Sequence, residues 1–211
     1  MPASMAQAPD PDAPLMRRVK RGDRHAFTAL VNKYRQPILN FLHRTLGDLT
    51  EAEDLAQATF VQVHKFAHRY RDGARFSTWL YTIARNLCLN EIRRRTRHPA
   101  ESLNAPRGEN LDAAPWQLED RSIAQPVDQV LEAELESKIQ EALTALPPNQ
   151  RIAVLLCRDP DLSYEDIARI LGCSVSATKS LIHRGRESLK ARLKPYLRTG
   201  AWNPGTRCQK L

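Results

Sequence analysis

Long apolar runs are missing from this 211-residue sequence, and so is the charge pattern of a secretion signal. No stretch of eighteen apolar residues occurs, which excludes a recognisable membrane-spanning helix. The first fifteen residues, MPASMAQAPDPDAPL, contain no basic start followed by an apolar segment. A signal peptide needs both features. We therefore expect the protein to be cytoplasmic.

Cysteine is scarce, and the four that occur form no CxxC pair. Cys88 and Cys157 lie in apolar helical runs, where a free thiol behaves as a small hydrophobic side chain. We expect these two, with Cys173 and Cys208, to be core or incidental residues rather than zinc ligands or disulfides. The sequence also shows no metal-ligand cluster, no nucleophile beside a base and no glycine-rich phosphate loop. We expect no enzyme activity, no metal and no cofactor.

Basic residues are abundant, and they are concentrated in one part of the chain. The formal net charge is +8 and the isoelectric point is near 9.6. Residues 15–98 hold 17 Lys and Arg against 7 Asp and Glu, a balance of +10. Such a balance favours a polyanionic partner, although charge alone does not choose between DNA, RNA and anionic lipid.

The charge and proline patterns divide the chain into two domains. Residues 99–129 hold 2 basic against 6 acidic residues, with several prolines and no apolar periodicity, which is typical of a linker. We expect a first domain over 15–98 and a second over 130–198. Residues 1–14 are predicted to be disordered, and the tail 199–211 receives no assignment.

Almost every periodic segment has helical spacing, and no segment has the pattern of a strand, so the predicted fold class is all-α. Phe27, Leu30, Val31 and Tyr34 form one apolar stripe and Ile38, Leu39 and Leu42 another. Pro37 either kinks one helix or separates two. A third stripe, from Leu55 to Phe66, follows an acidic helix start.

Residues 162–189, LSYEDIARILGCSVSATKSLIHRGRESL, have the pattern of a helix-turn-helix. Ser163 and Asp166 can form a capping box, Gly172 follows the first apolar stripe, and Ser174 can cap the second helix. The outward face of that second helix is small and basic, as suits the major groove of DNA. We expect Ser176, Lys179 and Ser180 near bases, with His183, Arg184 and Arg186 at phosphates and Ser174 at the helix start. The alternative is an ordinary solvated helix pair of another bundle.

Residues 76–98 combine aromatic rings with a run of arginines. Phe76, Trp79 and Tyr81 could stack on unpaired bases, or they could belong to the core. The arginines that follow repel one another unless anions are near, which favours bound phosphates over a merely solvated face. Just upstream, the polar loop from Arg69 to Arg75 bends at Gly73 and could hold an extruded base.

In order and spacing, these segments resemble the two-domain bacterial sigma factors of the extracytoplasmic-function type. AEDLAQATFVQVHKF (52–66) resembles the family's helix that docks on the RNA polymerase β′ coiled coil. FSTWLYTIARN (76–86) resembles the melting segment, and NEIRRRTR (90–97) resembles the reader of the minus-ten element. ALPPNQRIAVLL (145–156) and the helix-turn-helix resemble the module that binds the minus-thirty-five element. Gly185 stands where relatives commonly have alanine.

The resemblance implies a promoter-specificity subunit for core RNA polymerase, contacting its β and β′ subunits and promoter DNA. Such factors respond to stress or another signal, usually under an anti-sigma factor that is often membrane-embedded, and have no small-molecule substrate. Polymerase contacts would fall to Glu53, Asp54 and Gln57. Minus-ten contacts would fall to Arg69, Arg71, Asp72, Arg75, Phe76, Trp79, Asn86, Asn90, Arg93, Arg94, Arg95 and Arg97.

Two other functions fit parts of the sequence. A helix-turn-helix regulator that occupies an operator would use the second domain, but the first domain is the more basic of the two. A single-strand RNA-binding or antitermination protein would use residues 76–98, but it would leave the helix-turn-helix without a role.

Overall fold

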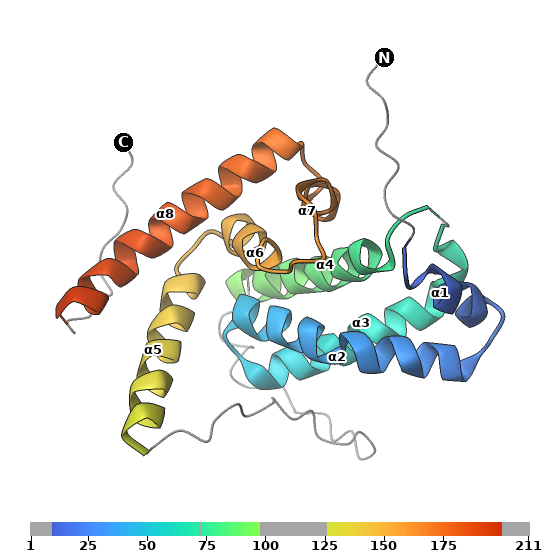
Figure 1. Cartoon of the computed structure of the whole chain (residues 1–211), viewed down its shortest axis with the longest axis horizontal. Helices are drawn as coiled ribbons and strands as arrows, with labels where there is room; N and C mark the ends of the chain where they lie inside the picture. Colours follow the sequence, from blue (N-terminus) through green and yellow to red (C-terminus); the bar gives the residue numbers. More distant parts are fainter. Residues whose placement is uncertain (1–9, 72, 98–125, 200–211) are drawn as a thin grey trace.

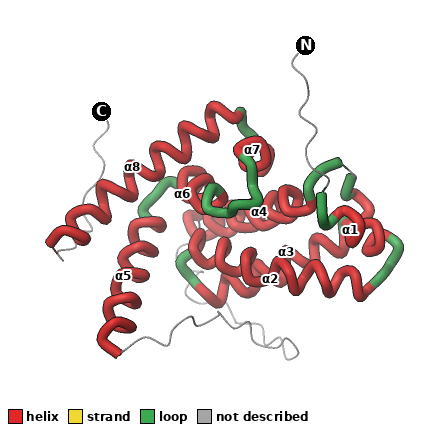
Figure 2. The backbone as a smooth tube through the Cα atoms, in the orientation of Figure 1, coloured by secondary structure: helices red, strands yellow, loops and turns green. Residues whose placement is uncertain are grey.

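The protein is represented by a computed structural model that describes residues 10–71, 73–97 and 126–199. Every regular element within those ranges is a helix (Figure 1, Figure 2). The prediction of an all-α protein is confirmed. The expected linker and tail fall mostly outside the described residues, and none of the described helices is long and apolar enough to cross a membrane.

The first domain is built on three long helices with well-defined ends. Asp23 and Asp48 accept hydrogen bonds from the first turns of α2 and α3, and Gly47 ends α2 with a positive φ. The elements are α1 (Ala13–Lys20), α2 (Arg24–Leu46), α3 (Leu49–Lys65), the short 3-10 helix η1 (Ala67–Arg69) and α4 (Phe76–Arg97).

One expectation for this domain needs correction, and one open alternative is decided. Residues 10–14 are ordered rather than disordered, because Asp12 is buried against α2 and α1 already begins at Ala13. Pro37 does not separate two helices, since α2 runs through it from Arg24 to Leu46. Its neighbours Ile38 and Leu39 are fully buried, so tertiary packing holds the helix together across the missing N–H donor.

The described residues of the second domain form four helices. They are α5 (Pro126–Thr144), α6 (Pro148–Leu156), α7 (Tyr164–Leu171) and α8 (Val175–Thr199). Helix α5 begins inside the range predicted as linker, with a proline in the first helical position, where its missing N–H donor costs nothing.

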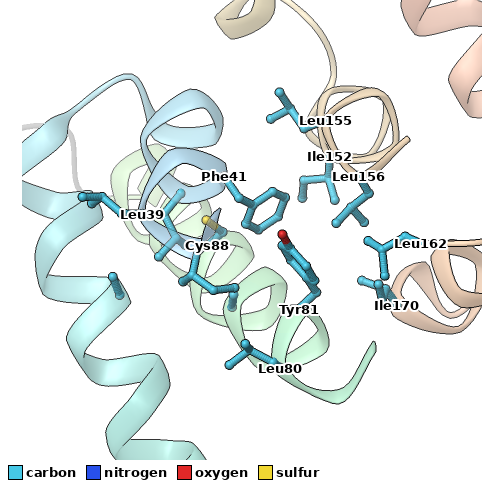
Figure 3. Packing of buried hydrophobic residues seen from close by; sticks show 14 of the residues in the cluster. Leu39, Phe41, Leu80, Tyr81, Cys88, Ile152, Leu155, Leu156, Leu162 and Ile170 are labelled. Atoms are coloured by element: carbon cyan, nitrogen blue, oxygen red, sulfur yellow. The ribbon is translucent and has the colours of Figure 1, made fainter. Parts of the chain in front are cut away.

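The two domains share one hydrophobic core. Helix α4 packs on α2 and α3 on one side and on α7 on the other, as Figure 1 shows. Figure 3 shows Phe41 and Tyr81 of the first domain facing Ile152, Leu156 and Leu162 of the second. The rings of Phe41 and Tyr81 meet edge to face with centroids 5.4 Å apart. Burial of such large apolar side chains is the main favourable contribution to this packing.

Gly185 lets α8 approach α6 closely. A Cβ atom at this position would lie 2.5 Å from Cγ2 of Val154 and 3.3 Å from the carbonyl oxygen of Gln150. The glycine is therefore explained by packing, since an alanine would force these two helices apart or displace Val154.

We expect Gly185→Ala to lower the free energy of unfolding by about 1–2 kcal/mol, because overpacking outweighs the better helix propensity of alanine. In a Val154→Ala background the 2.5 Å contact is removed and only the closer approach to Gln150 remains, so the same substitution should cost less or be neutral. Urea denaturation of the two single variants and the double variant measures the coupling. Equal effects of Gly185→Ala in both backgrounds would contradict the packing explanation.

Candidate nucleic-acid interface

The helix-turn-helix predicted from the sequence is present with its expected caps. The Ser163 hydroxyl accepts from the Asp166 backbone N–H at 3.1 Å, and the Asp166 carboxylate accepts from the Ser163 N–H at 3.2 Å. Gly172 ends α7 with φ of 65°. The Ser174 hydroxyl then accepts from the Ala177 N–H at 3.2 Å and caps α8. The capping pattern was readable because all its partners lie within a few residues of one another.

The predicted DNA-facing residues of α8 share one exposed surface. Thr178 and Ile182, on the opposite side of the helix, are buried against the rest of the domain. This arrangement leaves a small and basic helix face free for a groove of DNA. The exposed set is Ser174, Ser176, Lys179, Ser180, His183, Arg184 and Arg186.

Three of these cations are held in place by neighbours. The Lys179 ammonium lies 5.5 Å from the ring centroid of Tyr164, which is itself exposed. Arg184 donates to the Ser180 carbonyl at 3.3 Å, and Arg186 donates to the Cys157 sulfur at 3.3 Å. Such contacts reduce the conformational freedom that a long side chain loses on binding.

The aromatic residues at the start of α4 pack mainly against the protein. Phe76 is fully buried, with its ring 5.3 Å from that of Tyr34, and Tyr81 is buried beside Phe41. Trp79 is half-buried, 5.6 Å from the ring of Tyr70. In this conformation Phe76 and Tyr81 present no face to a base, and Trp79 remains the ring with accessible surface among the three.

The polar loop before α4 is basic and partly exposed. Arg69 lies over the ring of Phe66 at 4.7 Å, and Arg71 is exposed. Asp72 lies outside the described residues. Gly73 bends the loop with φ of 105°. The loop presents the basic side chains of Arg69 and Arg71 to solvent.

Arg75, in contrast, faces the second domain. Its guanidinium donates to the Asp161 carbonyl at 2.5 Å and lies 3.8 Å from the Asp166 carboxylate. A predicted minus-ten residue is therefore engaged within the chain in this conformation.

Two arginines of the predicted minus-ten run are paired with the protein's own carboxylates. Arg94 and Arg95 both bind Glu91, at 2.7 and 3.0 Å, and both approach Glu51 of α3. Burial opposes ionisation of Glu91, but the hydrogen bonds from the two arginines hold the pKa of this carboxyl below its usual value. The anions expected beside this arginine run are therefore in part the protein's own carboxylates, those of Glu51 and Glu91. Glu91 could have been recognised from its spacing of three and four residues from the two arginines.

The remaining predicted residues of α4 are exposed. Asn86 and Asn90 accept from Arg85 and Arg93 at 3.3 and 3.5 Å. Arg93 and Arg97 are exposed cations near the end of the helix. They form the accessible part of the basic surface of α4.

The predicted polymerase contacts lie on α3, away from the shared core. Asp54 is exposed, while Glu53 and Gln57 are half-buried. Gln57 borders an apolar hollow of about 370 Å³ that is also lined by Phe27, Val31, Phe60, Val61, His64 and Lys65. Val61 is 60% exposed. An exposed carboxylate at Asp54, one helical turn before Gln57 at the rim of an apolar hollow, is a suitable surface for a protein partner.

No local sequence pattern predicts the polar contacts that join the domains. The Thr78 hydroxyl donates to Asp166 at 2.9 Å, and the Tyr81 hydroxyl donates to Asp159 at 2.9 Å. Burial raises the pKa of Tyr81, and the neighbouring Asp159 carboxylate adds to the effect. Thr78 is 88 residues from Asp166, and Tyr81 is 78 from Asp159, so no local pattern could reveal these pairs.

A second polar link involves a buried cation. The Arg151 guanidinium donates to the backbone carbonyls of Thr45, Thr144 and Leu146. Two of these carbonyls lie at the ends of α2 and α5, where the helix dipole and unpaired oxygens favour a positive charge. Arg151 therefore joins helix ends of both domains.

Comparison with known proteins places both domains in one family. The model of Sigma-70 region 2 matches residues 30–98, and that of Sigma-70 region 4 matches residues 136–189. RNA polymerase sigma-H factor of Pseudomonas aeruginosa is 36% identical over 187 residues, which cover 89% of this chain and 96% of the relative. The ECF RNA polymerase sigma factor SigW of Bacillus subtilis is 34% identical over 85% of this chain and 95% of its own. The chain belongs to the extracytoplasmic-function sigma factors of the sigma-70 family.

Two solved structures have the same fold. Sigma factor RpoE of Bartonella quintana, in complex with the anti-sigma factor NepR, is 25% identical with a TM-score of 0.61, over 80% of this chain and 96% of that one. CnrH, in complex with the cytosolic domain of CnrY, is 22% identical with a TM-score of 0.62, over 88% of this chain and 99% of that one. This family of transcription initiation factors is not a class of enzymes.

We predict that Asp166→Asn destabilises the sigma factor by about 1–3 kcal/mol at pH 7, because a buried, multiply bonded carboxylate loses its charge. Burial raises the pKa of Asp166, but the bonds from Ser163 and Thr78 outweigh it and bring the pKa below the ordinary 3.8. The ionised carboxylate then makes its full contribution to the free energy of unfolding above about pH 4. This contribution is lost as the pH falls through the lower pKa of the folded state.

Urea denaturation at pH 7 and at pH 3 tests this pH dependence. The difference in the free energy of unfolding between wild type and Asp166→Asn should be smaller at pH 3 than at pH 7. The control is Asp161→Asn, which changes an exposed carboxylate in the loop before α7 while its backbone carbonyl still accepts from Arg75. A difference for Asp166→Asn that is the same at both pH values would contradict the assignment.

Proposed function

We propose that this sigma factor directs core RNA polymerase to its promoters by binding the minus-ten and minus-thirty-five elements with separate domains. The outward face of α8 reads the minus-thirty-five element as duplex DNA. The start of α4, the loop before it and the exposed cations near its end hold the opened minus-ten strand. The surface around Asp54 and Gln57 on α3 docks on polymerase.

The observation that carries the proposal is the exposure of the whole predicted face of α8, from Ser174 to Arg186, in a chain whose other domain bears its own basic surface. A regulator that only occupies an operator needs the exposed face of α8 but not the basic surface of the first domain. A promoter subunit needs both, because its two elements are separate sites on the DNA. The relatives named above are sigma factors over nearly their whole length.

The shared core implies a change of arrangement on promoter binding. Helix α7 contacts α4, and Arg75 is bonded to the second domain. A strand held at the start of α4 competes with these contacts. We therefore infer that the domains separate when polymerase and promoter bind, and that the arrangement described above is the free form.

The proposed partners follow from the family. Core polymerase, through its β and β′ subunits, and promoter DNA are the working partners. We propose that the protein acts in the cytoplasm, where these partners are, and that a stress or other signal controls it. Because the Bartonella relative forms a complex with an anti-sigma factor, we propose a partner of that class here as well.

Run-off transcription with purified core polymerase and promoter-bearing DNA tests the function. Specific initiation that depends on both core and this chain is the expected result. Specific binding to DNA without any core-dependent initiation would favour the operator-binding regulator instead.

For the docking surface, we expect the double substitution of Asp54→Ala and Gln57→Ala to weaken binding to core polymerase by about tenfold or more, equivalent to about 1.4 kcal/mol. Helical content and thermal stability should hardly change, because Asp54 is exposed and Gln57 lies at the surface. Titration of core into labelled protein measures the affinity. The control Glu165→Ala removes an exposed acidic residue from α7. Unchanged core affinity in the double variant would remove both residues from the docking surface.

A further inference from the structure

The segment from Asp10 to Asp12, which we call the N-terminal strap, contacts the beginning of α4 although it precedes α1. It lies before the part of the chain that matches region 2, which begins at residue 30. Its two carboxylates bind residues on α2, on the loop before α4 and on α4 itself. The sequence alone predicts only disorder for this segment.

Asp10 caps α4 from a distance of 66 residues in the sequence. Its Oδ2 atom accepts from the Phe76 backbone N–H at 2.8 Å, which satisfies one of the free donors at the helix start. The same oxygen lies 2.9 Å from the Tyr70 hydroxyl, which shares its single proton between Asp10 and the Ala74 carbonyl at 2.7 Å. One carboxylate therefore ties the beginning of the loop to the beginning of the helix.

Asp12 fixes the strap to α2. It is 3% exposed and accepts from Lys33 at 2.6 Å and from the Tyr34 hydroxyl at 2.5 Å. Its backbone N–H donates to Asp10 at 3.2 Å, so the position of Asp12 sets that of Asp10. Charged and buried bonds of this kind are among the stronger ones in proteins.

The residues tied together by Asp10 are those that surround the proposed base-binding loop. The ring of Tyr70 lies 5.6 Å from Trp79 and 6.4 Å from Phe76. Arg69, Arg71 and Arg75 belong to the loop, and Lys20 lies 5.8 Å from the ring of Tyr70. A carboxylate at this place offsets part of the repulsion among these cations and complements the positive end of α4.

We propose that Asp10 is a positioning residue for promoter opening, which holds the loop and the first turn of α4 in the geometry that receives the single minus-ten strand. The inference rests on the sigma function proposed above. Asp10 itself does not contact the DNA. It acts through Tyr70 and Phe76, which set the accessible surface of Trp79 and the direction of the loop arginines.

The test uses the full-length protein assembled with core polymerase. Permanganate reactivity of promoter thymines measures strand opening, first on a duplex promoter and then on a template with a pre-opened minus-ten bubble. Asp10→Ala should reduce opening of the duplex and retention of the bubble template by about five- to tenfold, as expected for loss of a helix cap. Core affinity should stay within about twofold, because the docking surface on α3 is separate.

Two further variants distinguish positioning from general stability. Asp10→Asn keeps an oxygen that can accept from Phe76 and Tyr70, so it should restore opening to within about twofold of wild type. Asp23→Ala removes a cap of the same kind from α2, where the Asp23 carboxylate accepts from the Ala26 N–H at 3.1 Å. It should lower the melting temperature comparably to Asp10→Ala but leave opening unchanged.

The outcomes separate the two proposals. If wild-type protein with core opens no promoter, the sigma function itself fails. If wild type opens the promoter and Asp10→Ala does so equally well, the positioning role is overturned. An equal loss of opening in Asp23→Ala and Asp10→Ala would also overturn it, since general destabilisation would then explain the effect.

Discussion

The buried carboxylate of Asp166 is the interaction on which the arrangement of this sigma factor depends. It is 1% exposed, and a charge so far from water must be surrounded by donors. Ser163 and Arg169 of its own domain bind it, and Thr78 of the other domain donates to it as well. The residue that completes the capping box of α7 thus also joins the helix-turn-helix to α4, the helix proposed to hold the opened strand.

The same logic explains the rest of the domain interface. Tyr81 and Arg151 are polar groups within a largely apolar contact, and each is bonded across the boundary between the domains. Polar groups of this kind add little net stability, but they cost free energy when they lose a partner inside the protein. Separation in water returns them to solvent at much lower cost. An interface built in this way can be specific while remaining able to open, which a promoter subunit with two separate grips requires.

Much of the fold followed from local sequence patterns, and the exceptions have a common physical cause. The helix-turn-helix was predictable because Ser163, Asp166, Gly172 and Ser174 act on neighbours a few residues away. The pairing of Arg95 with Glu51, 44 residues apart, and of Asp10 with Phe76, 66 residues apart, depends on how helices pack. Composition marked both the acidic residues and the arginines, but it could not show that they neutralise each other. For the same reason the rings of Phe76 and Tyr81 could not be assigned to core or to surface in advance.

We infer that the two promoter-binding domains of this chain pack together in the free protein and separate on the promoter. The distance between fluorescent labels at His68 and Glu187, which are exposed residues of the first and second domains, tests it directly. Single-molecule energy transfer should show one distance in the free protein and a longer one after addition of core polymerase and promoter DNA. An unchanged distance in a complex competent for initiation would contradict the separation of the domains.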